Sequence, residues 1–107
     1  MDEIRRQLVT LCRRARARQL GWPRDWRVHQ VMNPRTGVPF TEASAWEYIA
    51  EVLESGHAYQ VLILERPAGA KAFVLLIAQG PGVPEIYVKL QLGAGIVIGR
   101  SFHYSNC

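Results

Sequence analysis

The C-terminal quarter of the chain alternates apolar and polar residues on both sides of a glycine-rich tripeptide, Gly93-Ala94-Gly95. Alternation is the period of a β-strand with one buried face, and a short connection rich in glycine is typical of a β-hairpin. Burial also predicts the register, because pairing Leu92 with Ile96 gathers on one face the apolar residues Ile86, Val88, Leu90, Leu92, Ile96, Ile98 and Phe102. The other face then holds Tyr87, Lys89, Gln91, Ser101 and His103, with Gly99 opposite Lys89.

Helical spacing dominates the first half of the chain. Residues 2–20 place apolar residues at helical intervals and acidic residues at the start, so we expect a helix that ends before Gly21. Residues 41–56 predict a second helix, capped by Thr41 or Ser44, with Ser44-x-x-Glu47 as a capping box. Between the two helices we expect an ordered connection over residues 21–40, with the apolar anchors Trp22, Trp26, Val28, Val31 and Phe40.

The period changes after Gly56, which ends the second helix. Residues 59–65 and 71–79 predict two further strands ahead of the hairpin, so that residues 59–105 form an antiparallel meander. Helices segregated from an antiparallel sheet are typical of an α+β domain. We therefore expect a single domain over residues 1–107, with two N-terminal helices packed on a four-stranded antiparallel sheet.

Positive charge is concentrated near the N-terminus. Residues 1–27 contain eight arginines and three acidic residues, whereas residues 28–107 contain five basic and six acidic ones. A basic helix favours an anionic partner, either RNA or an acidic protein, and Arg13, Arg14 and Arg16 are the candidate contacts. An exposed helix with a solvated charged face fits the same pattern equally well.

The sequence also indicates the cellular compartment of the protein. The first residues are charged and no apolar signal segment follows them, and the longest apolar run, Ala72–Ala78, is far too short to span a bilayer. Cys12 and Cys107 have neither metal-ligand nor redox spacing. We expect a cytoplasmic protein without membrane contact, metal or cofactor.

The segment Glu85-Ile-Tyr-Val-Lys-Leu, followed by Ser101-Phe102 near the C-terminus, resembles the MqsR family of toxin ribonucleases. That family belongs to the RelE-like toxins. The resemblance implies a RelE- or barnase-like arrangement of helices against a small antiparallel sheet, cleavage of messenger RNA without a metal, and a cognate antitoxin as partner. The resemblance covers about the last two predicted strands, and the order of helices and strands along the chain supports it.

The resemblance also implies roles for individual residues. Tyr87 matches a tyrosine that the family uses in catalysis, and His103 stands where the family has a catalytic lysine, which is a departure from the pattern. Lys71 and Gln79 are candidates for a further lysine and glutamine of the family.

These residue types fit cleavage of RNA through its own 2′-hydroxyl group. An imidazole such as that of His103 transfers protons near neutral pH, and a phenol such as that of Tyr87 donates a hydrogen bond or a proton. Lys89 is a candidate electrostatic helper, and Arg100 is a candidate phosphate ligand, although the predicted register puts Arg100 on the apolar face. Gln91, Ser101 and Lys71 are candidates for substrate binding.

Two other functional classes stay open. The chain could be a non-catalytic nucleic-acid-binding module in which Tyr87 and Tyr104 stack on bases. It could also be an antitoxin or an immunity-type protein that binds a protein partner. Tyrosine and lysine on the outer face of a strand are often exposed to solvent without having a function. The oligomeric state is also open, and a homodimer is one possibility.

Overall fold

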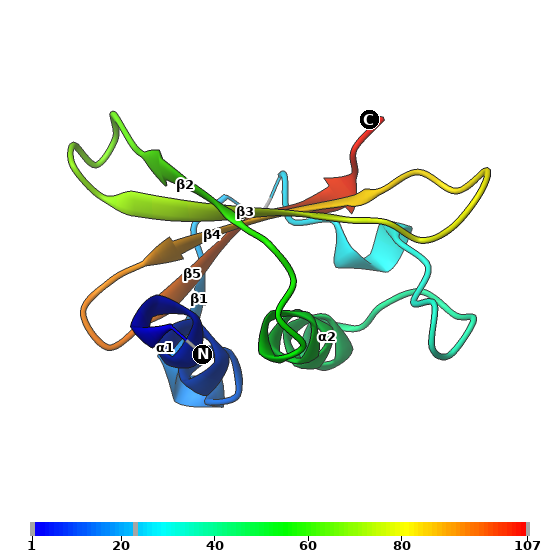
Figure 1. The fold of residues 1–107 in the computed structure, drawn as a ribbon, viewed down its shortest axis with the longest axis horizontal. Coiled ribbons are helices and arrows are strands. Elements are labelled where there is room, and N and C mark those ends of the chain that lie inside the picture. The colour runs from blue at the N-terminus through cyan, green and yellow to red at the C-terminus, as the bar shows by residue number, and fades with distance from the viewer. Residues whose placement is uncertain (1, 23, 107) are drawn as a thin grey trace.

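The chain folds into two layers, a five-stranded sheet and two α-helices that lie together on one side of it (Figure 1). The structure is a computed structural model and describes residues 2–22 and 24–106. Neighbouring strands follow the order β1-β5-β4-β3-β2. The elements are α1 (Glu3–Cys12), η1 (Ala15–Ala17), β1 (Arg18–Leu20), η2 (Val28–Gln30), α2 (Glu42–Glu54), β2 (Gln60–Ile63), β3 (Lys71–Ile77), β4 (Ile86–Leu92) and β5 (Val97–Tyr104).

The α+β class is confirmed, but the four-stranded antiparallel sheet is wrong. The predicted helix over residues 2–20 ends at Cys12, and Arg18–Leu20 form a fifth strand that runs parallel to β5. β1 supplies hydrogen-bond partners for the outer edge of β5 at residues 97–99, and Asp25 and Arg27 supply them at Phe102. Periodicity did not reveal this strand, because three residues are too few to show an alternation.

The remaining elements lie where the sequence predicts them, within shorter bounds. Thr41 caps α2 by accepting a hydrogen bond from the backbone N–H of Ser44, whose side chain accepts one from the N–H of Thr41. The capping box is therefore Thr41 with Ser44, and the predicted pairing of Ser44 with Glu47 is wrong. No helix in the described part of the chain is long and apolar enough to cross a membrane.

Aromatic residues from three segments form the centre of the core. The ring centroids of Trp26 and Trp46 lie 5.0 Å apart, and those of Phe40 and Phe102 lie 5.1 Å apart. The carboxylate of Glu42, in the first turn of α2, accepts hydrogen bonds from the indole Nε1 of Trp26 at 3.0 Å and of Trp46 at 2.8 Å. A single side chain thereby fixes the position of both indoles.

The described part of the connection, residues 21–22 and 24–40, is ordered, as predicted. Its anchors Trp26, Val28, Val31 and Phe40 are buried. Trp22 is the exception, because its side chain is 40% exposed, and the prediction that it anchors the connection in the core is wrong.

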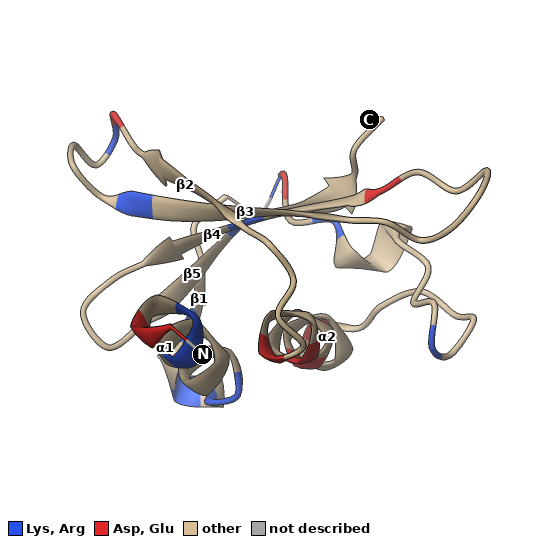
Figure 2. Cartoon of the chain, viewed as in Figure 1, with Lys and Arg blue, Asp and Glu red and all other residues tan. Residues whose placement is uncertain are grey.

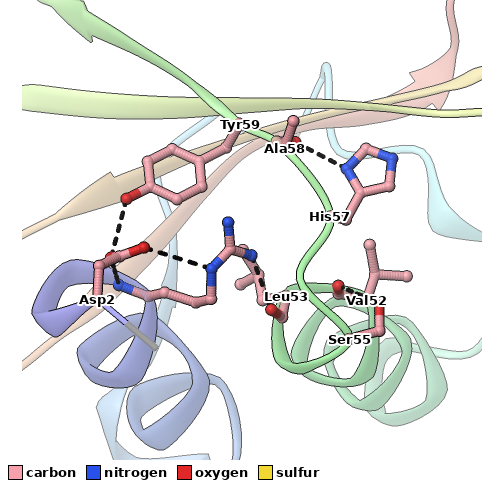
Figure 3. A network of polar contacts seen from close by, with 8 residues as sticks. Asp2, Val52, Leu53, Ser55, His57, Ala58 and Tyr59 are labelled. Carbon is pink, nitrogen blue, oxygen red and sulfur yellow. Dashed lines mark hydrogen bonds and ion pairs between the residues drawn. The ribbon is translucent and has the colours of Figure 1, made fainter.

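A second polar network joins the start of α1 to the end of α2 and to the segment that leads into β2 (Figure 3). Asp2 caps α1 by accepting a hydrogen bond from the backbone N–H of Arg5 at 2.7 Å, and it accepts another from the hydroxyl of Tyr59 at 3.1 Å. The Arg5 guanidinium donates to the carbonyl oxygen of Leu53 at 2.7 Å. The Arg5 backbone bond, followed by the Tyr59 hydroxyl, lowers the pKa of the Asp2 carboxyl.

The Glu42 bridge gives a first prediction. Glu42→Ala leaves two buried indole N–H groups without their acceptor, so we expect the free energy of unfolding to fall by about 2–4 kcal/mol in urea denaturation. Glu47→Ala is the matched control, because Glu47 lies on the same helix and makes an exposed ion pair with Arg13 at 3.7 Å. It should cost less than about 1 kcal/mol. Equal losses in the two variants would contradict the bridge.

The Asp2 cap gives a second prediction. A carboxyl whose pKa is lowered by folding stabilises the native state above the ordinary carboxyl range, and this contribution disappears as the pH falls through the folded pKa. Asp2→Asn keeps a capping oxygen and removes the charge. Wild type should therefore be more stable than Asp2→Asn at pH 7, and the difference should shrink toward pH 3. A constant difference across this range, measured by urea denaturation, would show that the charge has no role.

Candidate active site

Figure 1 shows α1 and α2 on one side of the sheet, and the alternation of side chains along β4 places the candidate site on the other side. Strand alternation turns Ile86, Val88 and Leu90 of β4 toward the helices, where all three are fully buried. Tyr87 and Lys89, which lie between them, therefore face the open side. The predicted polar face of β4 is confirmed in this respect.

The register of the hairpin differs from the predicted one. Leu92 pairs with Val97 instead of Ile96, and the ladder shifts by one residue between Lys89 and Leu90. The shift leaves one extra residue, Arg100, in β5, as in a β-bulge. Tyr87 consequently pairs directly with His103, where the prediction placed Ser101.

Close packing at Gly99 explains the extra residue. A Cβ at position 99 would lie only 2.7 Å from the ring of Trp26, so this position faces the core and holds no side chain. Val97 and Gly99 both face the core and are two positions apart in the sequence. The next core residue, Phe102, is three positions beyond Gly99. Alternation can place all three on one face only with one extra residue between them.

Three expectations fail for this reason. Gly99 pairs with Leu90 on the core face, not with Lys89 on the polar face. Ile98 pairs with Gln91 on the open face, and Ile96 lies outside β5. Arg100 does not lie on the apolar face, because its guanidinium donates to the side-chain Oε1 of Gln91 at 2.8 Å.

Tyr87 and His103 form the centre of the site. Their rings are stacked, with centroids 5.3 Å apart and planes inclined by 15°. Nδ1 of His103 lies 2.8 Å from the carbonyl oxygen of Tyr104. A carbonyl oxygen can only accept, so Nδ1 must carry the hydrogen, and Nε2 is the ring atom left to exchange a proton.

Cationic and polar groups flank the stacked pair. Lys89 is half-buried and lies opposite Ser101, two positions along β4 from Tyr87. Gln91 is only 7% exposed and holds Arg100, whose pKa is lowered by burial. None of the five strands contains an acidic residue, so no carboxylate within the sheet neutralises Lys89 or Arg100. The open face thus favours an anionic ligand.

The structure separates other predicted residues from this site. Lys71 pairs with Ile63 at the far end of β3, and alternation turns it toward the opposite face. Gln79 lies beyond the end of β3 and donates to the hydroxyl of Tyr48. Tyr104 pairs with Ile86 on the core side, and its hydroxyl accepts the backbone N–H of Met32, so it does not share a face with Tyr87.

The N-terminal arginines lie on the helical side of the molecule. α2 contains four acidic residues and no basic one, and α1 beside it carries both signs (Figure 2). Arg13 contacts the carboxylate of Glu54 at 2.8 Å, which raises the pKa of Arg13 and lowers that of Glu54. An open groove of about 530 Å³ runs along this surface, lined by Arg6, Val9, Thr10, Arg13, Arg14 and Glu54. Part of the N-terminal charge is therefore used within the fold.

Sequence reasoning did not predict that Trp22 contributes to the open face. The guanidinium carbon of Arg100 lies 3.4 Å from the centroid of the Trp22 ring. Nothing in the periodicity of residues 21–40 indicates this contact, since it depends on the pairing of β1 with β5.

In the described part of the chain, neither a metal-binding geometry nor a reactive thiol adds to the site. Among residues 2–22 and 24–106, no group of three or more His, Cys, Asp or Glu side chains is placed to hold a metal ion. Cys12 is buried, and burial raises the pKa of its thiol to about 12. Cys107 lies outside the described residues.

Comparison with protein-family models, with curated proteins and with solved structures found no match for this chain. The resemblance to the MqsR toxins therefore stays a prediction, which rests on the residues of the last two strands.

Proposed function

We propose that this protein is an endoribonuclease that cleaves RNA without a metal, by attack of a ribose 2′-hydroxyl on the adjacent phosphate. The observation that carries the proposal is the stacked Tyr87–His103 pair on an open sheet face with Lys89 beside it. Proton-transfer groups and unneutralised cations in one place are what this reaction requires.

Each group has a defined part in the proposed reaction. Nε2 of His103 takes the proton of the 2′-hydroxyl as the 2′-oxygen forms a bond to phosphorus. Lys89 and Arg100 balance the negative charge that builds up on the phosphate oxygens. The bond from phosphorus to the 5′-oxygen then breaks, and the Tyr87 hydroxyl gives that oxygen its proton. The imidazolium of His103, stacked on the ring, stabilises the phenolate until solvent returns the proton.

The wider proposal follows the resemblance of the last two strands. On this reading the chain is an MqsR-like toxin of the RelE type, with a RelE- or barnase-like arrangement of helices and sheet. It would act in the cytoplasm and be neutralised by a cognate antitoxin. The groove along α1, with Arg13 and Arg14, is the proposed surface for an acidic antitoxin segment. Measurement of the molecular mass in solution tests whether the toxin is a homodimer.

The proposal predicts the effect of removing each proton-transfer group. General acid–base groups contribute typically about 10²- to 10⁴-fold in rate. His103→Ala and Tyr87→Phe should therefore each slow single-turnover cleavage of labelled RNA in EDTA at least about a hundredfold, with RNA affinity nearly unchanged. Lys89→Ala should lower both the rate and the affinity.

Arg66→Ala is the charge-matched control, because Arg66 is exposed in the turn between β2 and β3. It should leave cleavage intact. Cells that tolerate strong expression, together with varied RNAs left whole by the purified protein, would exclude the nuclease. Salt-dependent RNA binding without cleavage would then favour a non-catalytic binding module, and absence of RNA binding would favour a protein that binds another protein.

A further inference from the structure

Trp22 differs from the other two tryptophans of the chain. Trp26 and Trp46 are 7% and 1% exposed, whereas Trp22 is 40% exposed. The backbone N–H of Gly21 donates to the carbonyl oxygen of Gly99 at 3.0 Å, which fixes the start of the connection beside the extra residue of β5. Trp22 is therefore an exposed aromatic ring at a well-fixed position of the backbone.

Arg100 covers this ring and is itself held in place. Its guanidinium carbon lies 3.4 Å from the ring centroid, which is van der Waals contact directly over the ring. The hydrogen bond to Gln91 at 2.8 Å restrains the guanidinium from the other side, and Gln91 is buried between β3 and β5. Arg100 forms no ion pair among the described residues, so its charge is left for a ligand.

An exposed aromatic ring beside an unpaired guanidinium is the combination that holds single-stranded nucleic acids. A base stacks on the flat groups, and the cation attracts the neighbouring phosphate. Arg100 and His103 are three positions apart on β5, about 10 Å at the rise of a strand. An adjacent nucleotide of an extended single strand can bridge this distance.

We propose that Trp22 and Arg100 form a base-stacking subsite that holds a single-stranded RNA beside Tyr87 and His103. This inference rests on the proposed nuclease function and specifies how the substrate is held. Bases in a duplex are already stacked and paired, so the subsite selects single strands. Because stacking needs no 2′-hydroxyl, a DNA strand should also bind there without being cleaved.

A single-stranded DNA oligonucleotide of mixed sequence separates binding from cleavage, since it lacks the 2′-hydroxyl nucleophile. It should quench the tryptophan fluorescence of the wild type, and an oligonucleotide with abasic positions should bind more weakly. Trp22→Ala should raise Kd about 5- to 100-fold and leave the salt dependence unchanged, because it removes stacking and no charge. Trp22→Phe keeps a ring and should recover most of the affinity.

Arg100→Ala should weaken binding and also reduce the salt dependence by about one phosphate contact. Val38→Ala is the control for loss of an exposed apolar side chain, since Val38 is 58% exposed in the connection before α2. Circular dichroism and thermal melting check the folding of each variant. The abasic comparison uses the wild type alone, so equal affinity for intact and abasic strands overturns the subsite even if a variant does not fold.

The outcomes distinguish this inference from the nuclease proposal. Cleavage of RNA together with a Trp22→Ala affinity within twofold of wild type would overturn the stacking subsite and leave the nuclease standing. Trp22-dependent binding of single strands without RNA cleavage would support the subsite and exclude the nuclease. Equal affinity for duplex and single strand, or for intact and abasic strands, would overturn the subsite.

Discussion

Trp26 occupies the space that a side chain at position 99 would fill, and much of the structure depends on this contact. The contact requires Gly99 to face the core, and this in turn requires one extra residue before Phe102. That residue is Arg100, which reaches the open face and contacts Gln91 and Trp22. The same indole donates to Glu42 and so ties the sheet to the start of α2. One packing contact inside the core therefore shapes the polar surface on the other side of the sheet.

The two faces of the sheet have different charges for a physical reason. On the helical side, Arg13 forms an ion pair with Glu54 of α2. Arg5 and Arg6 form ion pairs with acidic residues at the start of α1. Arg5 satisfies a carbonyl at the end of α2, and Arg18 satisfies the carbonyl of Cys12. On the open face, Lys89 and Arg100 have no acidic neighbour in any strand. These two cations on the sheet therefore indicate ligand binding more strongly than the excess of arginine in the sequence does.

The stacked pair owes its geometry to the shifted register. In the predicted register His103 would lie diagonal to Tyr87, within reach of the longest side chains only. Direct pairing brings the two rings into parallel contact, and the carbonyl of Tyr104 leaves Nε2 as the free nitrogen of the imidazole. Such an arrangement supports proton transfer between a substrate and two fixed groups. Lys89 pairs with Ser101 across the two strands, and Arg100 precedes Ser101 in β5, so two cations accompany the stacked pair on this face.

The sequence by itself determined a helix within residues 41–56, the four strands β2 to β5 and the hairpin between β4 and β5, because these depend on local periodicity, caps and glycine turns. It also placed Tyr87 and His103 on one face, although alternation is unbroken only in β4 and in the part of β5 that follows the extra residue. Only the tertiary structure decided the pairing between strands, because the register depends on what packs beneath Gly99. It also decided that residues 18–20 leave the helix for the edge of β5, and that Trp22 meets Arg100. Both follow from partners distant in the chain, which no local pattern can specify.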